Sequence, residues 1–387
     1  MHMGIEVVIF AIKLFLVFNI IMGLASFCTW VERKGSALIQ DRVGANRAGA
    51  YFDFNLDIVR GFPSFLRPLG APVTYALLLP VVTGIKIAGQ LGIINTLLND
   101  AVKALFKEDF VPDGVSNFMH SLAPFLAVLP VFVAFAILPF APEFTVLGTV
   151  VRPQLAPIDV GILFFLAMGS VAVYGVALAG WTGNNKYSLL GALRASAQMI
   201  SYELAMGISV VTIIIFYGTP DLFKIVELQE GSILQWGVFR NIGTGLIAMI
   251  AFFIAGMAET KRAPFDLPES ESELVAGYFT EYSGMKFLIF WLGEFAEIAL
   301  FSFVMVLLFF GGWHIPFVHL PAGVWWVALI GHGVLMAKVL FFCVLQIVIR
   351  WTLPRFRYDQ LMNLGWKFLL PLSMVNLVIA AAWELSK

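Results

Sequence analysis

Long apolar runs are the feature of this sequence that most limits its fold. Several of them exceed the roughly 20 residues that an α-helix needs to cross a lipid bilayer. Only 13% of the 387 residues are charged and 60% are hydrophobic. A water-soluble fold of this length could not bury so much apolar surface. We therefore expect an integral membrane protein built from α-helices.

The charge balance and the cysteine content exclude several functions. A net charge of −1 gives no basic surface for nucleic acid. Cys28 and Cys343, the two cysteines, lie in different apolar runs, so this chain alone should build no disulfide framework, zinc site or thiolate-bound iron–sulfur cluster. The histidines lack the same-helix pairing that would hold two haems. The first apolar run is too long for a signal-peptide core, and we interpret it as a retained span.

A window of about 19 residues predicts eight membrane spans. Lys and Arg gather in the connections between spans 1 and 2, 3 and 4, 5 and 6, and 7 and 8. These connections should therefore be cytoplasmic and both termini should face the outside. The expected fold is an all-α polytopic membrane protein, one membrane domain over residues 1–387, with long structured cytoplasmic loops. The predicted spans are 5–31, 117–140, 158–181, 191–217, 238–259, 285–312, 323–351 and 364–384.

The connection between spans 1 and 2 contains a further apolar stretch, 73–98, which polar residues and a proline interrupt. A single crossing there would put basic segments on opposite sides of the membrane, so we expect a re-entrant or interfacial helix, or a tight hairpin. Nearer its start, Arg42 and Arg47 lie beside paired glycines. These glycines predict a tight turn that holds two guanidinium groups near the membrane surface. Anchoring to lipid headgroups is the simpler alternative.

The fourth predicted span carries a carboxylate near its middle. As a helix, its first turns place Arg194, Gln198 and Tyr202 on one stripe, and Glu203 lies deeper. A carboxylate at this depth costs roughly 2.5–3.5 kcal/mol on insertion scales, so it should face a partner, water or the bundle interior. Proton or ion handling is the default interpretation, and a structural hydrogen bond from a protonated Glu203 is the alternative.

The connection between spans 5 and 6 is the most densely charged. From Glu259 to Glu281 it holds six acidic and two basic residues. Carboxylates so close together cannot all ionise at low cost, so some should have raised, coupled pKa values and exchange protons near neutral pH. A divalent-metal site is conceivable, although no histidine joins the acids. Apolar residues between the acids disfavour a merely solvated loop.

Two spans carry further charges at depth. Glu294 and Glu297 lie three residues apart near the centre of span 285–312, and Lys338 lies near the centre of span 323–351. A lysine and a glutamate at the same depth lower each other's desolvation cost. We therefore expect Lys338 to form an ion pair with Glu297 or Glu294.

Six collinear motifs stand out along the chain. They are ERK at 32–34, RVGANR at 42–47, DAVK at 100–103 with KED at 107–109, the segment 191–203, AETKRAPFDL at 258–267, and ESELV at 271–275 with EYSG at 281–284. Together they resemble one known family, the quinone-binding membrane subunit of proton-pumping NADH:quinone oxidoreductase, respiratory complex I. Ala45 and Ser270 depart from the family pattern, which also assigns neither Glu297 nor Lys338. The segment 50–99 is longer than the pattern and is expected to be an insertion in the loop between spans 1 and 2.

The resemblance implies a subunit without a redox centre, whose cytoplasmic loops form an access chamber for a quinone, either ubiquinone or menaquinone. FMN and iron–sulfur clusters would lie in partner subunits, namely the peripheral arm and neighbouring membrane subunits, within a bacterial plasma membrane. The implied proton path comprises Glu32, Glu203, Glu259, Asp266, Glu269, Glu271, Glu273, Glu281 and Glu294. The candidates for the chamber lining are Arg42, Arg47 and Arg262, with Phe265 and Tyr282 as ring-packing neighbours.

Two other functions stay open from the sequence. Equivalent subunits of a ferredoxin-fed complex I relative or of a membrane-bound hydrogenase share such loops, because other chains choose the electron donor. A stand-alone secondary transporter would use Glu203 and Lys338 as its coupling pair, and broken helices with an inverted repeat would favour it. Charge massed on the cytoplasmic side instead favours a docking surface for partner subunits.

Overall fold

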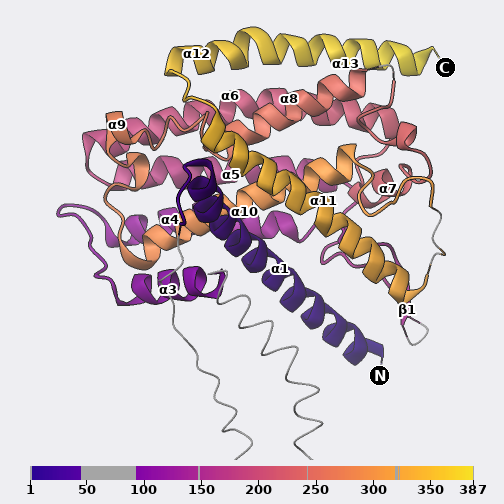
Figure 1. The fold of residues 1–387 in the computed structure, drawn as a ribbon, viewed down its shortest axis with the longest axis horizontal. Helices are drawn as coiled ribbons and strands as arrows, with labels where there is room; N and C mark the ends of the chain where they lie inside the picture. Colours follow the sequence, from indigo (N-terminus) through magenta and orange to yellow (C-terminus); the bar gives the residue numbers. More distant parts are fainter. Residues whose placement is uncertain are drawn as a thin grey trace, which may run out of the picture.

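The computed structural model describes residues 2–44, 93–146, 149–241, 243–318, 321 and 323–386. These residues are mostly helical (Figure 1). Seven of their helices are long and apolar enough to cross a membrane, and a shorter apolar helix, α8, lies where the fifth span is predicted. The all-α polytopic fold is therefore confirmed. A short antiparallel hairpin, β1 (Phe144–Val146) with β2 (Thr149–Val151), connects two of the spans.

The helices match the predicted spans closely, with one span built from three successive segments. That last span joins α12 (Tyr358–Asn363) to α13 (Leu370–Leu385) through a π-helical stretch, η4 (Leu364–Leu369). The other spanning helices are α1 (His2–Ile39), α4 (Asn117–Phe135), α5 (Gly161–Thr182), α6 (Lys186–Tyr217), α8 (Thr244–Glu259), α10 (Gly284–Phe309) and α11 (Trp325–Thr352). The short elements are α3 (Ile93–Phe106), α7 (Leu222–Glu227), η2 (Ile233–Gln235), α9 (Glu271–Leu274) and η3 (Gly277–Phe279).

Helix α1 is longer than its predicted span. The prediction ended it at residue 31, whereas the helix continues to Ile39 and carries Glu32 and Arg33 on its last turns. Glu, Arg and Lys are good helix formers, and no proline interrupts the segment. Both side chains also gain partners on other elements, so a charged stretch that resembles a loop in sequence extends the helix.

Helix α10 forms the centre of the bundle. Every residue from 293 to 309 is buried, and α1, α4, α8 and α11 pack against it. A helix that is apolar on all sides is expected in an interior rather than at a one-sided surface. Because α10 also carries Glu294 and Glu297, it places two carboxylates inside the bundle.

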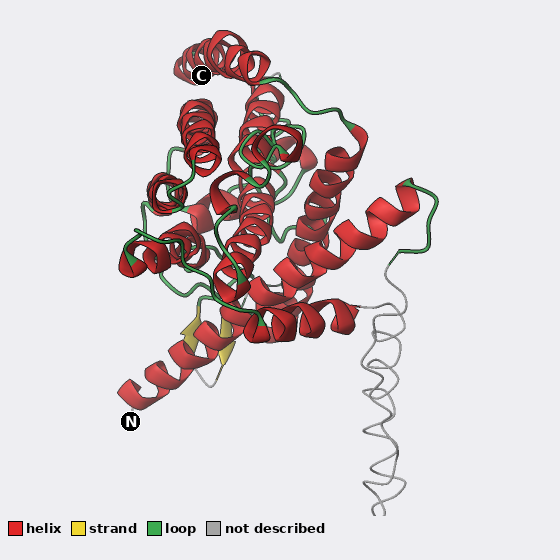
Figure 2. Cartoon of the chain, turned by 90° about the vertical axis from the view of Figure 1, so that its left-hand side faces the viewer, coloured by secondary structure: helices red, strands yellow, loops and turns green. Residues whose placement is uncertain are grey.

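The two ends of the bundle carry different elements. Both termini lie at one end with β1 and α7, whereas α3 and α9 lie at the opposite end (Figure 1). Viewed after a quarter turn, several helices are seen nearly end-on, as in a bundle (Figure 2). An even number of spans places both termini on one side. That this side faces the outside stays a prediction from the Lys and Arg distribution. We call the opposite end, with α3 and α9, the loop end.

Part of the connection between spans 1 and 2 lies outside the described residues. Arg47, the re-entrant or interfacial segment up to residue 92, and most of the expected 50–99 insertion fall there. The described part resumes at Ile93 with α3, which contacts α1 and α10. Its Asp100 accepts a hydrogen bond from Arg33 of α1, so an ion pair ties α3 to the bundle.

Candidate functional site

A tight turn after α8 carries two buried cations. The Thr260 hydroxyl donates to the Met257 carbonyl over 3.0 Å, and Lys261 adopts a positive φ of 56°. The chain therefore reverses immediately after the helix. Lys261 and Arg262 are only 3% and 7% exposed. Buried charges need partners, so the surrounding carboxylates define the site.

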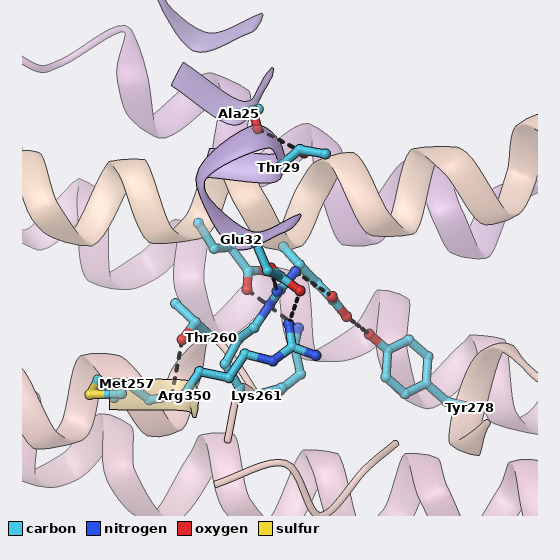
Figure 3. Close-up of polar contacts among 11 residues, drawn as sticks. Ala25, Thr29, Glu32, Met257, Thr260, Lys261, Tyr278 and Arg350 are labelled. Carbon is cyan, nitrogen blue, oxygen red and sulfur yellow. Dashed lines mark hydrogen bonds and ion pairs between the residues drawn. The ribbon is translucent and has the colours of Figure 1, made fainter. Parts of the chain in front are cut away.

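Arg262 joins three parts of the chain. Its guanidinium donates to Glu32 of α1 and lies 3.4 Å from Glu294 of α10. Glu32 also accepts from Arg350 of α11 over 2.6 Å, and Glu294 accepts from the Tyr278 hydroxyl over 3.0 Å. Figure 3 shows Glu32 and Arg350 pointing toward one another, with Lys261 and Tyr278 close by. Each carboxylate of this cluster thus has two partners.

Lys261 faces a different carboxylate of α10. Its ammonium lies 3.4 Å from Glu297, and both side chains are almost fully buried. Burial lowers the pKa of Lys261, but the nearby Glu297, Glu294 and Glu259 raise it by more, so that its pKa lies above its ordinary value. Lys261 is therefore held in its charged form inside the protein.

Glu259, the last residue of α8, is a buried acid without a hydrogen-bond partner for either carboxyl oxygen among the described residues. Glu259 and Glu297 both line a cavity of ≈20 Å³ between α4, α5, α6 and α10. A cavity needs about 10–15 Å³ to hold a water molecule. The cavity is thus large enough for water to bridge the two carboxyl groups.

Two further acids of the same loop lie beside this cluster. Asp266 forms a 2.8 Å ion pair with Arg355, yet burial raises its pKa. Burial, followed by the charges of Glu294 and Asp266, raises the pKa of Glu269 well above its ordinary value. These directions agree with the expectation that closely spaced carboxylates in this loop bind protons more tightly.

The remaining predicted acids take no part in the ion pairs of Arg262, and Glu203, Glu273 and Glu281 are half-buried or exposed. Glu203 on α6 is half-buried and accepts a hydrogen bond from Ser170 of α5. Glu273 forms a 2.6 Å ion pair with Arg194, and Glu281 accepts from the Asn185 amide over 2.8 Å. Glu271 begins α9 at the loop end.

Of the five candidate chamber residues, only Arg262 belongs to the charge cluster described above. Arg42 is exposed and donates to Gln40 over 2.6 Å, and Arg47 lies outside the described residues. The small cavity that Arg262 lines with Arg350 measures ≈10 Å³. That volume is far below the several hundred Å³ of an ordinary small-molecule site.

The two aromatic candidates are packed against protein side chains. Phe265 lies between Tyr202 and Phe356, with ring centroids 5.7 and 5.5 Å away. Tyr282 stacks in parallel on His120, with the ring centroids 4.1 Å apart. Both rings therefore stabilise the loop end of the bundle in this structure.

The predicted pairing of Lys338 with Glu297 or Glu294 is wrong. The Lys338 ammonium instead donates to the carbonyls of residues 310, 312 and 314, over 2.8–2.9 Å, and lies 4.5 Å from the Trp236 ring centroid. These carbonyls follow the C-terminus of α10, where carbonyls lack helical partners and the helix dipole attracts a cation. The middle of α11 therefore meets the end of α10, not its centre.

Sequence reasoning missed several residues that shape the site. Lys261, Tyr278 and Arg350 were not assigned to it, and Gln198 was noted only as part of a helical stripe. The buried Gln198 amide donates to the carbonyls of Ala258 and Phe265, over 2.7 and 2.8 Å. It thereby fastens both ends of the turn that presents Lys261 and Arg262. A polar residue on an otherwise buried stripe was the available signal.

Comparison with known proteins shows the family to which the chain belongs. A family model described as NADH dehydrogenase matches residues 83–381. A Rhodothermus marinus protein, NADH-quinone oxidoreductase subunit 8, is 42% identical over 96% of this chain and 96% of its own length. Two other relatives also carry names of NADH-quinone oxidoreductase subunits. The one from Geobacter metallireducens is 40% identical over 97% of this chain and 96% of its own length, and the one from Protochlamydia amoebophila is 46% identical over 77% and 86%. The chain therefore belongs to the NADH dehydrogenase family, which includes these membrane subunits of NADH-quinone oxidoreductase.

Proposed function

We propose that this chain, as a membrane subunit of NADH:quinone oxidoreductase, contributes to the quinone access chamber and couples quinone reduction to proton translocation. The relatives are named as subunits of that enzyme, which implies other subunits as partners. FMN and iron–sulfur clusters belong to those partners in this proposal. The relatives from Rhodothermus marinus and Geobacter metallireducens support a bacterial plasma membrane as the location of this multi-pass chain in the proposal.

One observation carries the proposal: buried carboxylates extend from the loop end into the centre of the bundle. Glu32 and Glu294 share Arg262, Glu297 follows one helical turn deeper on α10, and Glu259 adjoins the same cavity as Glu297. Acids at membrane depth are expensive and by default indicate proton handling. Each can pass a proton to the next by a shift in protonation, directly or through water.

The chemistry of quinone reduction explains why a series of carboxylates that leads into the bundle would be useful. Reduction of a quinone by two electrons requires two protons and places negative charge on the head group before those protons arrive. A head group near Arg262 would gain stabilisation from the guanidinium. It would also compete for that cation with Glu32 and Glu294, which would then share less of its positive charge.

A chamber for the quinone ring needs a surface beyond the described residues of this chain, because the cavity at Arg262 is small. We place the chamber at the loop end, between this chain and its partner subunits, beside α1, α3 and the start of α10. The Arg33–Asp100 ion pair and the position of the Arg33 guanidinium, 5.5 Å from the Trp291 ring centroid, hold these three helices together. Leu38 of α1 and Phe106 of α3 are exposed there and would contact the apolar tail.

Glu259→Gln tests the proton path, since glutamine keeps the size of the side chain but cannot carry the proton. The assembled complex is reconstituted into vesicles, and NADH:quinone reductase activity and proton uptake are measured together. Both should fall at least about tenfold, because a positioned proton carrier contributes 10²–10⁴-fold to such steps.

The matched control is Glu143→Gln, which alters an acid paired with Arg152 at the other end of the bundle. This variant should pump normally. Wild-type rates and proton uptake in Glu259→Gln, in correctly assembled complex, would refute the proton path.

A further inference from the structure

The proposed path of buried carboxylates does not by itself explain the Lys261–Glu297 ion pair. A buried ion pair is costly to form, and neutral residues of similar size often stabilise a fold as well or better. This pair lies beside the Glu259 carboxyl, which has no hydrogen-bond partner among the described residues, and the water-sized cavity. Its position therefore suggests a use connected with the proton on Glu259.

The charges around the pair do not balance unless at least one carboxyl holds a proton. Among the described residues, ion pairs join the cations Lys261, Arg262 and Arg350 to the carboxyl groups Glu32, Glu294 and Glu297, and Glu259 adjoins them without a paired cation. Two further acids add negative charge nearby, Glu203 toward Glu259 and Glu269 toward Arg262. Glu32 and Glu294 are satisfied by the two arginines, and Glu297 by Lys261. A net charge inside a membrane protein is expensive. The extra carboxyl, Glu259, is thus the group that stores the proton.

The groups that face Lys261 come from three elements. Glu259 ends its own helix, Glu294 and Glu297 come from α10, and the Tyr278 ring centroid, from η3, lies 6.0 Å from the ammonium. Glu269 belongs to the loop-end side of the cluster and is half-buried. Lys261 is accordingly the cation that decides how negative charge is shared between Glu297 and Glu259.

We propose that Lys261 is a positioning residue for proton transfer: its pairing with Glu297 keeps Glu297 ionised and the proton on Glu259, and loosening of the pair lets that proton move. The O–H bond of Glu259 breaks and one forms on Glu297, with a water in the shared cavity as relay. No electrons are exchanged in this step. The inference rests on the proposed proton path and specifies what regulates proton transfer along it.

The turn that carries Lys261 links this step to the loop end. Arg262 is the next residue, and Gln198 fastens the turn at both ends, so a shift of Arg262 toward a new anion would also pull on Lys261. Such an anion is the reduced quinone head group of the proposed function. The pair would then loosen at the moment when protons are required.

Three variants test the inference in the assembled, reconstituted complex. Lys261→Met should lower the number of protons pumped per NADH at least twofold and add an infrared band of a protonated carboxylic acid, because Glu297 takes up a proton. Lys261→Arg should restore the wild-type number of protons pumped per NADH and should not show the additional infrared band. Lys261→Met/Glu297→Gln should assemble like the wild type, since it leaves no uncompensated charge, but should still pump poorly.

Lys286→Met is the matched control, because it removes a lysine from a 2.9 Å ion pair with Asp109 outside this cluster. It should leave the number of protons pumped per NADH unchanged. Normal pumping by the double variant would overturn the inference, since Lys261 would then only neutralise a buried charge. If Glu259→Gln fails to pump while Lys261→Met pumps normally, the inference alone is wrong. If Glu259→Gln itself pumps normally, the proposed proton path is wrong.

Discussion

Helix α10 meets the buried Lys261 near its middle and the half-buried Lys338 at its C-terminal end, and the two lysines have different partners. Lys261 lies 3.4 Å from the Glu297 carboxylate. Lys338 donates to three backbone carbonyls that follow the helix. Carboxylates can gain or lose a proton near neutral pH, whereas carbonyls cannot. The first lysine therefore lies in a site suited to proton chemistry, and the second acts as a cap.

The comparison shows that a charge at membrane depth is not by itself evidence of transport. Both lysines would attract the same interpretation from sequence, since each interrupts or borders an apolar span. What separates them is the chemistry of the atoms around each ammonium. Substitutions at and around the two lysines can therefore distinguish a role in proton transfer from a role in stability.

Arg262→Ala should have the largest effect, a loss of more than about tenfold in quinone reductase activity, because it removes the cation proposed to stabilise negative charge on the reduced head group, and loss of one such donor typically costs about 10²–10³-fold in rate. Glu32 keeps Arg350 and Glu294 keeps Tyr278, so the complex should still assemble. The assay is quinone reductase activity at several quinone concentrations. A normal rate and apparent quinone affinity would contradict the assignment of Arg262.

Gln198→Leu should follow, because it removes one of the two hydrogen bonds that each of the Ala258 and Phe265 carbonyls accepts, and only the backbone donors Lys261 and Leu267 remain. Each lost hydrogen bond contributes about 0.5–1.5 kcal/mol, and the turn that carries Lys261 would loosen. We expect a several-fold lower quinone reductase activity. Gln229→Leu is the control, since Gln229 donates similarly to the Leu307 carbonyl over 2.8 Å. Equal loss of activity in both variants would show a general stability effect.

Lys338→Met should destabilise the protein without changing its coupling. Three carbonyls lose their donor, at a cost of about 1–3 kcal/mol for each group left unsatisfied. The midpoint of thermal inactivation should fall, while protons pumped per NADH stay the same. Lys338→Arg should recover part of the stability. If the folded Lys338→Met complex pumped a different number of protons per NADH, Lys338 would also take part in coupling, as is proposed for Lys261.

Glu269→Gln should change the pH dependence of stability. Burial raises the pKa of Glu269 well above its ordinary value, so the folded protein binds this proton more tightly than the unfolded chain does. The resulting stabilisation is complete at low pH and is lost as the pH rises from about 4–5 toward the raised value. Glutamine stays neutral throughout, so the variant should lose less stability at high pH. Parallel curves for variant and wild type would contradict this.

Arg194→Ala should have the smallest effect. Its ion pair with Glu273 lies near the surface, where such pairs contribute about 0–1 kcal/mol. We expect thermal inactivation and pumping within error of the wild type. A large loss of either would mean that Glu273 belongs to the proton path despite its exposure.

The candidate site was only partly predictable from sequence. Glu32, Glu294 and Arg262 were singled out as separate residues, and the structure brings them together although Arg262 and Glu32 are 230 residues apart. Phe265 and Tyr282 were predicted as ring-packing neighbours of a quinone, but in the structure protein side chains pack on both rings. Lys261 was counted among the bases of its loop without a partner, because spacing along one loop does not show which helix it faces.

Local composition and length were enough to predict eight helical spans, because a segment in lipid must satisfy its backbone hydrogen bonds internally. Seven of the described helices are long and apolar enough to cross a membrane, and the shorter α8 lies at the remaining predicted span. The partner of each charge inside the bundle, in contrast, was set only by the packing of the helices. That choice depends on how the helices are tilted and where their ends meet. Lys338 and Glu297 both lie near the middle of a span in sequence, yet α11 runs along the C-terminal half of α10, with Gln346 at Ser302 and Lys338 beyond the end of the helix. Lys338 therefore meets carbonyls, and Glu297 meets Lys261.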